Sequence, residues 1–373
     1  MSEVARTLET RCRHAKHDRG DSPAGRGGLR GRQKPMAEPD IATLLHDARW
    51  LAHRYDRQRD EIHFVWLPRE AHRAAAFLTG EDVARATPRH IIPRRLLAGH
   101  SFPQAPLHAI LHSGLTGSTL LTHALDREGV AMTLSEPPIL TDAVSYRLSG
   151  APRAQADALL DDILSLLARP FGPGEAVIVK MGSVANLLGA DILARRPASK
   201  ALCLHAPLPV YLASVARKGL WGRIWGRKLF GTLRSARMTD LGFNEAEIFE
   251  HTDLQIAADA WLILHRVMHA ALARSGDRAA TIDSESLLTT PDRALTAIAR
   301  HFDLALDVDA LVADPLFGRH AKTGEAFDSE RRARELRDAH AAYGEEIDVV
   351  VTWARQVAGA LGITWDLPRR LDL

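Results

Sequence analysis

The chain of 373 residues is 46% hydrophobic and 25% charged, and its 48 Lys and Arg against 46 Asp and Glu give a formal net charge of +2. This near balance excludes a nucleic-acid binder that relies on bulk positive charge, and no apolar run reaches the roughly 18 residues that a membrane span needs. The two cysteines, Cys12 and Cys203, lie in a polar and an apolar segment, which argues against a disulfide or a thiolate metal cluster and favours a cytoplasmic protein.

Residues 1–35 form a basic tail. This segment is rich in Gly and Arg, carries nine bases against four acids and has almost no core-forming side chains. Because it cannot bury enough apolar surface to offset the entropy of ordering, we expect it to be disordered. The positive excess of the chain therefore lies outside its predicted folded part.

Residues 36–105 are predicted to form an N-terminal α/β extension packed on the core. Apolar residues follow helical spacing over 41–51, residues 63–67 are typical of a strand, and 69–78 are helix-like. Residues 86–105 hold three prolines without a clear period and are interpreted as a connector.

Residues 106–373 are predicted to form the main domain, an α/β unit with a helical C-terminus. Short apolar segments alternate with helical patterns, and the chain ends in two predicted helices, 329–342 and 345–361. The predicted strands are 107–111, 130–134, 176–179, 201–204 and 279–282. Strands that are apolar without alternation and separated by helices indicate a parallel sheet covered on both faces.

A small-residue turn joins the first of these strands to the next helix. It contains two glycines and four hydroxyl residues: Ser113, Gly114, Thr116, Gly117, Ser118 and Thr119. Glycine lets the backbone curl with its amides pointing inward, and the helix N-terminus adds a partial positive charge. The turn therefore fits a phosphate or a similar anion, although a merely tight strand-to-helix turn would have the same composition.

The turn differs from a Walker A loop. In the pattern G-x-x-x-x-G-K-[ST], Ser118 stands where the lysine belongs and His112 where the first glycine belongs. Without the lysine, ATP or GTP hydrolysis is disfavoured. A nucleotide-dependent kinase or NTPase with a variant loop stays an alternative.

Several segments, in order, resemble the PAPS-dependent sulfotransferases of the P-loop superfamily. The resemblance spans about residues 107–305 and comprises residues 116–121, Glu136-Pro137, Val179-Lys180, 196–200, Pro207 with Ser214, and 282–287. It implies a P-loop fold, PAPS as cofactor and transfer of a sulfuryl group to a hydroxyl or amine of a small molecule or peptide. It further implies that the turn holds the 5′-phosphosulfate and that Ser214 contacts the 3′-phosphate. Arg217 or Lys218, the bases that follow Ser214, would hold the same phosphate by their charge.

Two cations of the family pattern are replaced. Leu115 stands where the first motif has a base, and His205-Ala206 where the second has Arg-Asp. Either other bases substitute, or PAPS is not the ligand, or the chain is a non-catalytic binding protein that retains the fold.

Lys180 and Glu136 are the candidate catalytic residues. Sulfuryl transfer requires positioning and stabilisation of developing charge, as phosphoryl transfer does. Lys180 ends an apolar strand, where α/β folds place ligands, although a lysine there can also simply reach solvent. Glu136 follows the second strand and is the candidate general base.

Residues 217–237 contain seven bases and no acid, and we expect them to form a basic lid over the anion. No metal site is predicted, because His265 and His269, although four apart, lack the glutamate of a metalloprotease helix. The acceptor and the oligomeric state have no sequence signature.

Overall fold

A five-stranded parallel sheet organises the folded unit, Pro39–Leu373. The computed structural model describes residues 39–86, 88–238, 241–313 and 329–373; the predicted tail, 1–35, lies outside them. The strands are β4 (Leu107–His112), β5 (Ala131–Ser135), β6 (Ala176–Lys180), β7 (Ala201–His205) and β8 (Ala279–Asp283), in the order β5-β6-β4-β7-β8. Nearly every strand residue is buried, which explains the lack of alternation.

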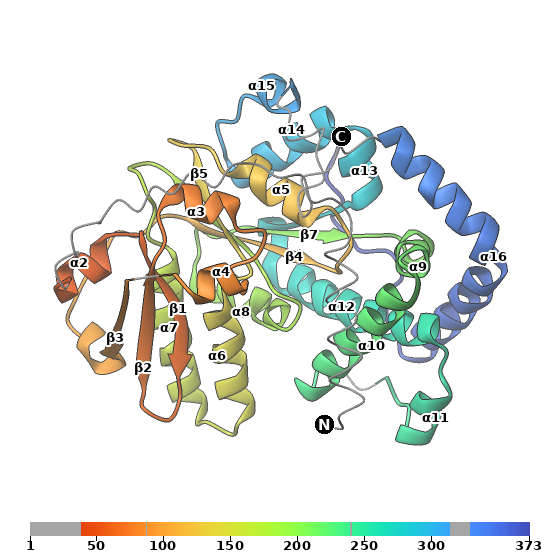
Figure 1. Cartoon of the computed structure of the whole chain (residues 1–373), viewed down its shortest axis with the longest axis horizontal. Helices are drawn as coiled ribbons and strands as arrows, with labels where there is room; N and C mark the ends of the chain where they lie inside the picture. The colour runs from red at the N-terminus through yellow and green to blue at the C-terminus, as the bar shows by residue number, and fades with distance from the viewer. Residues whose placement is uncertain (1–38, 87, 239–240, 314–328) are drawn as a thin grey trace, which may run out of the picture. The chain divides into compact units, whose positions relative to one another are not determined.

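Helices cover both faces of this sheet, so the predicted fold class is confirmed (Figure 1). On one face, Ile110 and Ile178 pack in a cluster with α5 (Ser118–Leu125), α13 (Ser284–Thr289) and α14 (Pro291–Phe302). The other face carries a larger apolar cluster. Its helices include α6 (Pro138–Leu148), α7 (Arg153–Leu167), α8 (Gly189–Arg195), α9 (Leu208–Arg217), α10 (Gly219–Ser235) and α12 (Asp253–Ser275).

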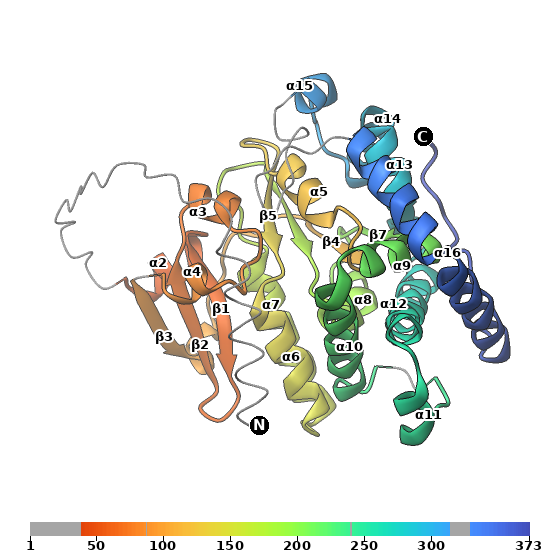
Figure 2. The same ribbon diagram turned by 45° about the vertical axis from the view of Figure 1, so that its right-hand side comes forward.

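The N-terminal part builds a separate antiparallel sheet in the order β1-β2-β3. Its elements are α2 (Ile41–His46), β1 (Trp50–Asp56), β2 (Glu61–Trp66), α3 (Arg69–Ala74), α4 (Glu81–Ala84), β3 (Arg89–Pro93) and a 3₁₀ turn, Arg94–Leu97. The sheet lies beside α6 and α7 (Figure 2). Arg54 fixes it there by a bidentate pair with Asp142, both contacts being 2.8 Å. The predicted connector 86–105 thus contains a strand, β3, that sequence reasoning missed.

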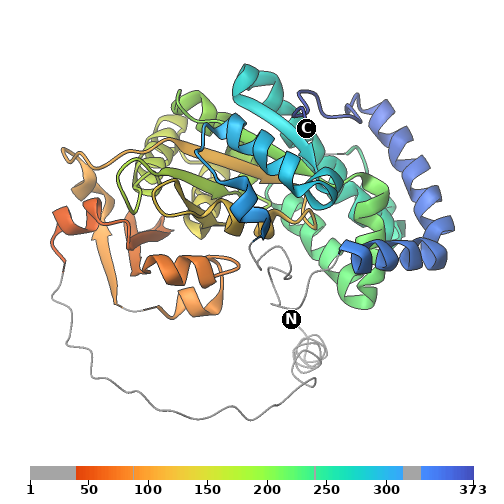
Figure 3. The ribbon, with the colours of Figure 1, turned by 90° about the horizontal axis from the view of Figure 1, so that it is seen from above.

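One long helix, α16 (Ser329–Ala360), replaces the two helices predicted at the C-terminus. Gly344, which lies between the two predicted helices, is a helical residue. The helix continues because Ile347, Val350 and Ala354 give it one buried face. It packs along α9 and α12 (Figure 3).

Helix α12 contains an 18-residue stretch that is apolar enough to cross a membrane. However, 72% of this stretch is buried inside the protein. It lies between the sheet and α10 (Figure 1). Its apolar sequence is therefore explained by packing. The remaining helices are α11 (Glu245–Glu250) and α15 (Val308–Ala313), with 3₁₀ turns at Ala185–Leu188 and Gly276–Arg278.

Candidate anion site at the β4–α5 loop

The predicted anion loop follows β4, the central strand of the parallel sheet. The next two strands of the chain, β5 and β6, lie on one side of β4, and β7 and β8 lie on the other. The loop is therefore at the topological switch point, where α/β folds bind ligands. Gly114 and Gly117 have φ values of +82° and +75°. These left-handed conformations favour glycine and curl the loop before α5.

Buried polar contacts hold the loop in place. Asn186 donates from Nδ2 to the carbonyl of His112 at 3.0 Å, and the amide of Gly114 donates to His112 Nδ1 at 3.1 Å. Ser113 Oγ accepts from the amide of Ala206 at 3.2 Å. Ser113 therefore fixes the loop to the end of β7. Because Nδ1 of His112 accepts, a neutral His112 carries its proton on Nε2.

Lys180 lies beside the first turn of α5 and is wholly buried. Its Nζ is 3.2 Å from Thr119 Oγ1, 3.1 Å from Glu136 Oε1 and 4.4 Å from the ring centre of Phe77. The loop has Ser118 where a Walker A loop has its lysine. A lysine from the neighbouring strand β6 lies beside the start of α5 instead. The alternative of a lysine that reaches solvent is excluded.

Glu136 faces both Lys180 and His112. Its Oε1 is 3.6 Å from His112 Nε2, and its side chain is 22% exposed. Burial by itself raises the pKa of Glu136, but the contact with His112 and the charge of Lys180 outweigh it and lower the pKa to about 2. Glu136 is thus ionised and a weak base while paired. An anion that draws Lys180 away would raise its pKa and strengthen it as a base.

Two buried hydroxyl groups near the loop have no hydrogen-bond partner among the described residues. They are Thr116 Oγ1, in the loop itself, and the phenol of Tyr211, on α9. A buried hydroxyl without a partner costs about 1–3 kcal/mol. Thr116 therefore has a donor ready for a ligand oxygen.

Aromatic and aliphatic side chains flank the loop. A Cβ added to Gly114 would lie 3.2 Å from the Trp225 ring of α10, and one added to Gly117 would lie 3.4 Å from Leu288 of α13. Sequence reasoning did not assign Trp225, Phe77 or Asn186 to the site. Of these three, only Trp225 could have been found from the sequence, because it lies in the basic stretch after α9.

The residues predicted to hold a 3′-phosphate lie on α9 and at its end. Ser214 is half-buried on α9. Arg217 Nη1 donates to Glu335 of α16 at 2.5 Å, and Lys218 Nζ lies 5.4 Å from the ring centre of Trp221. Arg217 would have to leave Glu335 to bind a phosphate.

The basic stretch 217–237 forms mostly the helix α10, and acids from other elements pair with its arginines. Arg223 contacts Glu346, Arg227 contacts Asp253, and Arg234 lies 3.7 Å from Glu245. The stretch therefore packs as part of the helical layer, with four of its arginines paired to acids, rather than as an unpaired basic lid.

The histidines of the α12 region have structural partners. His265 Nε2 bonds to the carbonyl of Trp365 at 2.7 Å and its ring stacks on Trp261. His251 Nδ1 lies 2.9 Å from Asp259 Oδ2. Each ring therefore has a protein partner at one of its nitrogens.

We expect Gly114→Ala to destabilise the fold and to abolish anion binding at the loop. The substitution forces a left-handed alanine, at about 1–2 kcal/mol, and crowds Trp225. Gly150→Ala is the matched control, because Gly150 has φ +86° with nothing near the added Cβ. Urea unfolding should show Gly114→Ala to be the more damaging by about 1 kcal/mol. Equal losses in the two variants would contradict the packing role of Gly114.

No family model matches the sequence, and no curated protein matches it. Among solved structures, the chain is similar to a sulfotransferase domain from the curacin biosynthetic pathway, at 14% identity and a TM-score of 0.37, over 72% of this chain and 100% of that domain. It is also similar to the sulfotransferase domain of the Synechococcus PCC 7002 olefin synthase, at 16% identity and a TM-score of 0.34, over 63% of this chain and 84% of the other. At these scores the similarity carries no argument about the site or its ligand.

Proposed function

We propose that the protein transfers a sulfuryl group from PAPS to a hydroxyl or amine of a small molecule or peptide. The observation that carries the proposal is the wholly buried Lys180, placed between the glycine loop and Glu136. A buried ammonium at a loop with inward-curling glycines is a site for a transferred anionic group. The ordered sequence resemblance then selects PAPS among such anions.

The residues present fit the 5′ end of PAPS. The left-handed glycines at 114 and 117 curl the backbone, and Thr116 keeps a hydroxyl without a partner among the described residues. When bound, PAPS supplies the sulfuryl group, whose bond to the phosphate oxygen breaks as the acceptor atom bonds to sulfur. The loop amides at 113–119 and Thr116 would hold this end of the molecule.

Lys180 would stabilise the negative charge on the oxygens at the reacting centre. Glu136 and Thr119 hold its Nζ beside the loop, so only a turn of the side chain is needed to reach the anion. Glu136 would take the proton of the acceptor hydroxyl or amine as Lys180 turns toward the anion. His112, whose Nε2 lies 3.6 Å from Glu136, orients that carboxylate. Ser214 and Arg217 or Lys218 would bind the 3′-phosphate once Arg217 leaves Glu335.

One contact favours the kinase or NTPase alternative. Lys180 Nζ lies 3.2 Å from Thr119 Oγ1, which brings a lysine to the hydroxyl at the last place of the Walker pattern. A phosphoryl-transfer enzyme could use the same pair.

Calorimetric titration of the full chain distinguishes these functions. We expect 3′-phosphoadenosine-5′-phosphate to bind at least about tenfold more tightly than AMP, because the 3′-phosphate adds charge-assisted hydrogen bonds. Tighter binding of ATP with Mg²⁺ would instead support the kinase or NTPase function. If none of the three nucleotides binds, the transferase proposal is wrong and a non-catalytic binding protein is favoured.

A further inference from the structure

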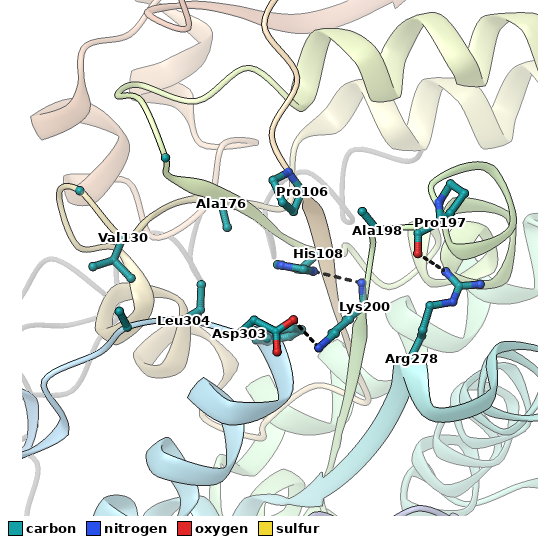
Figure 4. A pocket seen from close by; sticks show the side chains of 14 residues that line it. Pro106, His108, Val130, Ala176, Pro197, Ala198, Lys200, Arg278, Asp303 and Leu304 are labelled. Atoms are coloured by element: carbon teal, nitrogen blue, oxygen red, sulfur yellow. Dashed lines mark hydrogen bonds and ion pairs between the residues drawn. The ribbon is translucent and has the colours of Figure 1, made fainter.

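A cavity lies at the opposite edge of the parallel sheet from the anion loop. Its volume is about 490 Å³, and it is lined by residues at the amino ends of the strands, among them Pro106 just before β4, His108 in β4, Ala176 of β6 and Lys200 before β7 (Figure 4). The anion loop follows the carboxyl end of β4, so the two sites are separated by the length of this strand.

His108 presents a neutral hydrogen-bond donor to this cavity. Its Nδ1 accepts from the backbone amide of Lys200 at 3.0 Å, so its proton is on Nε2. Figure 4 shows this second ring nitrogen directed into the cavity. Burial lowers the pKa of His108 to about 4, and the imidazole therefore stays neutral near pH 7. Its ring stacks on Phe302 at 5.0 Å, which fixes its orientation.

Lys200 presents a charged donor to the same cavity. Its Nζ lies 2.6 Å from Asp303 Oδ2, and the two side chains are 25% and 74% exposed respectively. Lys200, the less exposed of the two, therefore stays in place. The Asp303 carboxylate can turn away from it and be stabilised by water. An anion that enters the cavity can take the place of Asp303 on Lys200.

Apolar side chains line other parts of the cavity. Val130, Ala176 and Leu304 line the cavity. Arg278 also lines the cavity, and its Nη1 donates to the carbonyl groups of Leu193 in α8 and of Ser199 before β7, at 2.8 and 3.2 Å.

We propose that this cavity binds a small organic carboxylate with an apolar body. One donor is neutral and one is charged, which matches the two oxygens of a single carboxylate with charge −1. The apolar wall accommodates the rest of the ligand. The site is independent of the proposed transferase function, because it shares none of the residues at the anion loop.

The experiment titrates the full chain with 4-phenylbutanoate and compares it with 4-phenylbutanamide and 4-phenylbutylamine. These probes have nearly the same shape and differ in charge. We expect the carboxylate to bind at least about tenfold more tightly than either, because only it accepts from Lys200 as a charged group. Equal binding of the amide, or no binding of the carboxylate at millimolar concentration, would overturn the proposal.

Two variants change the affinity in opposite directions. Lys200→Met should weaken carboxylate binding by about tenfold or more. Asp303→Asn should tighten it about two- to fivefold, since it removes the competing partner of an exposed pair. Asparagine tolerates the left-handed conformation of Asp303, φ +56°. Asp303→Asn therefore keeps the backbone even where Lys200→Met lowers stability.

Arg153→Met is the control, because it removes a cation that is 95% exposed and outside the cavity. It should leave the affinity unchanged. The titration is repeated with saturating 3′-phosphoadenosine-5′-phosphate, which should not compete. Competition would place the probe at the anion loop and contradict the proposal, as would an unchanged affinity in Lys200→Met and Asp303→Asn.

Discussion

Lys180→Met should lower the rate of sulfuryl transfer by about 10²–10³-fold, the usual loss when one preorganised donor to a transition-state oxygen is removed. Methionine has nearly the length of lysine and leaves little space, so the loop backbone should keep its shape. The loss should therefore appear mainly in kcat, with a smaller weakening of 3′-phosphoadenosine-5′-phosphate binding. Steady-state kinetics and calorimetry on the same preparation measure both.

The control for Lys180→Met must separate chemistry from folding. The substitution leaves the Glu136 carboxylate without its cation, which costs about 1–3 kcal/mol for a partly exposed group. In Lys180→Met/Glu136→Gln this unpaired charge is gone, so stability should recover while transfer stays low. Transfer that recovers together with stability in the double variant would contradict the catalytic roles of both Lys180 and Glu136. Arg153→Met, on the surface, should leave transfer unchanged.

The parallel sheet could be predicted because each strand is buried on both faces. Segments such as 107–111 and 176–179 consist almost wholly of apolar residues. A strand in which polar and apolar residues do not alternate fits few places other than a sheet covered on both faces. The loop could also be predicted from a local pattern. Two glycines between a strand and a helix indicate a turn with left-handed backbone conformations. Lys180 could be placed at the site because its strand ends there.

Contacts distant in sequence explain what the sequence did not reveal. Strand β3 contains Arg89 and Pro93 and has only one fully buried residue, so its pairing with β2 rather than its own pattern defines it. Asn186 binds His112 across 74 residues, and no local motif marks such a contact. The pairing of Arg217 at the end of α9 and of Arg223 in α10 likewise depends on acids that come later in the chain, Glu335 and Glu346.

Glu136→Gln should change how the stability of the protein depends on pH. The pKa of Glu136 falls from its ordinary value of 4.5 to about 2 on folding. Because the folded value is the lower one, the ionised carboxylate stabilises the protein above pH 4.5, and this stabilisation is lost as the pH falls toward 2. Its full size is about 3 kcal/mol at neutral pH, of which about 2 kcal/mol should be lost by pH 3.

Urea unfolding at several pH values between 6 and 3 tests this expectation. The difference in free energy of unfolding between the natural protein and Glu136→Gln should be largest at pH 6 and should shrink toward pH 3, because only the natural protein loses the ionised group. Glu245→Gln removes a carboxylate that is 91% exposed and is the matched control, for which the difference should stay near zero throughout. A constant difference for Glu136→Gln would mean that the carboxylate does not ionise against Lys180. The low basicity of Glu136 in the site without a ligand would then need another cause. The proposed movement of Lys180 from Glu136 to an incoming anion would lose its physical basis.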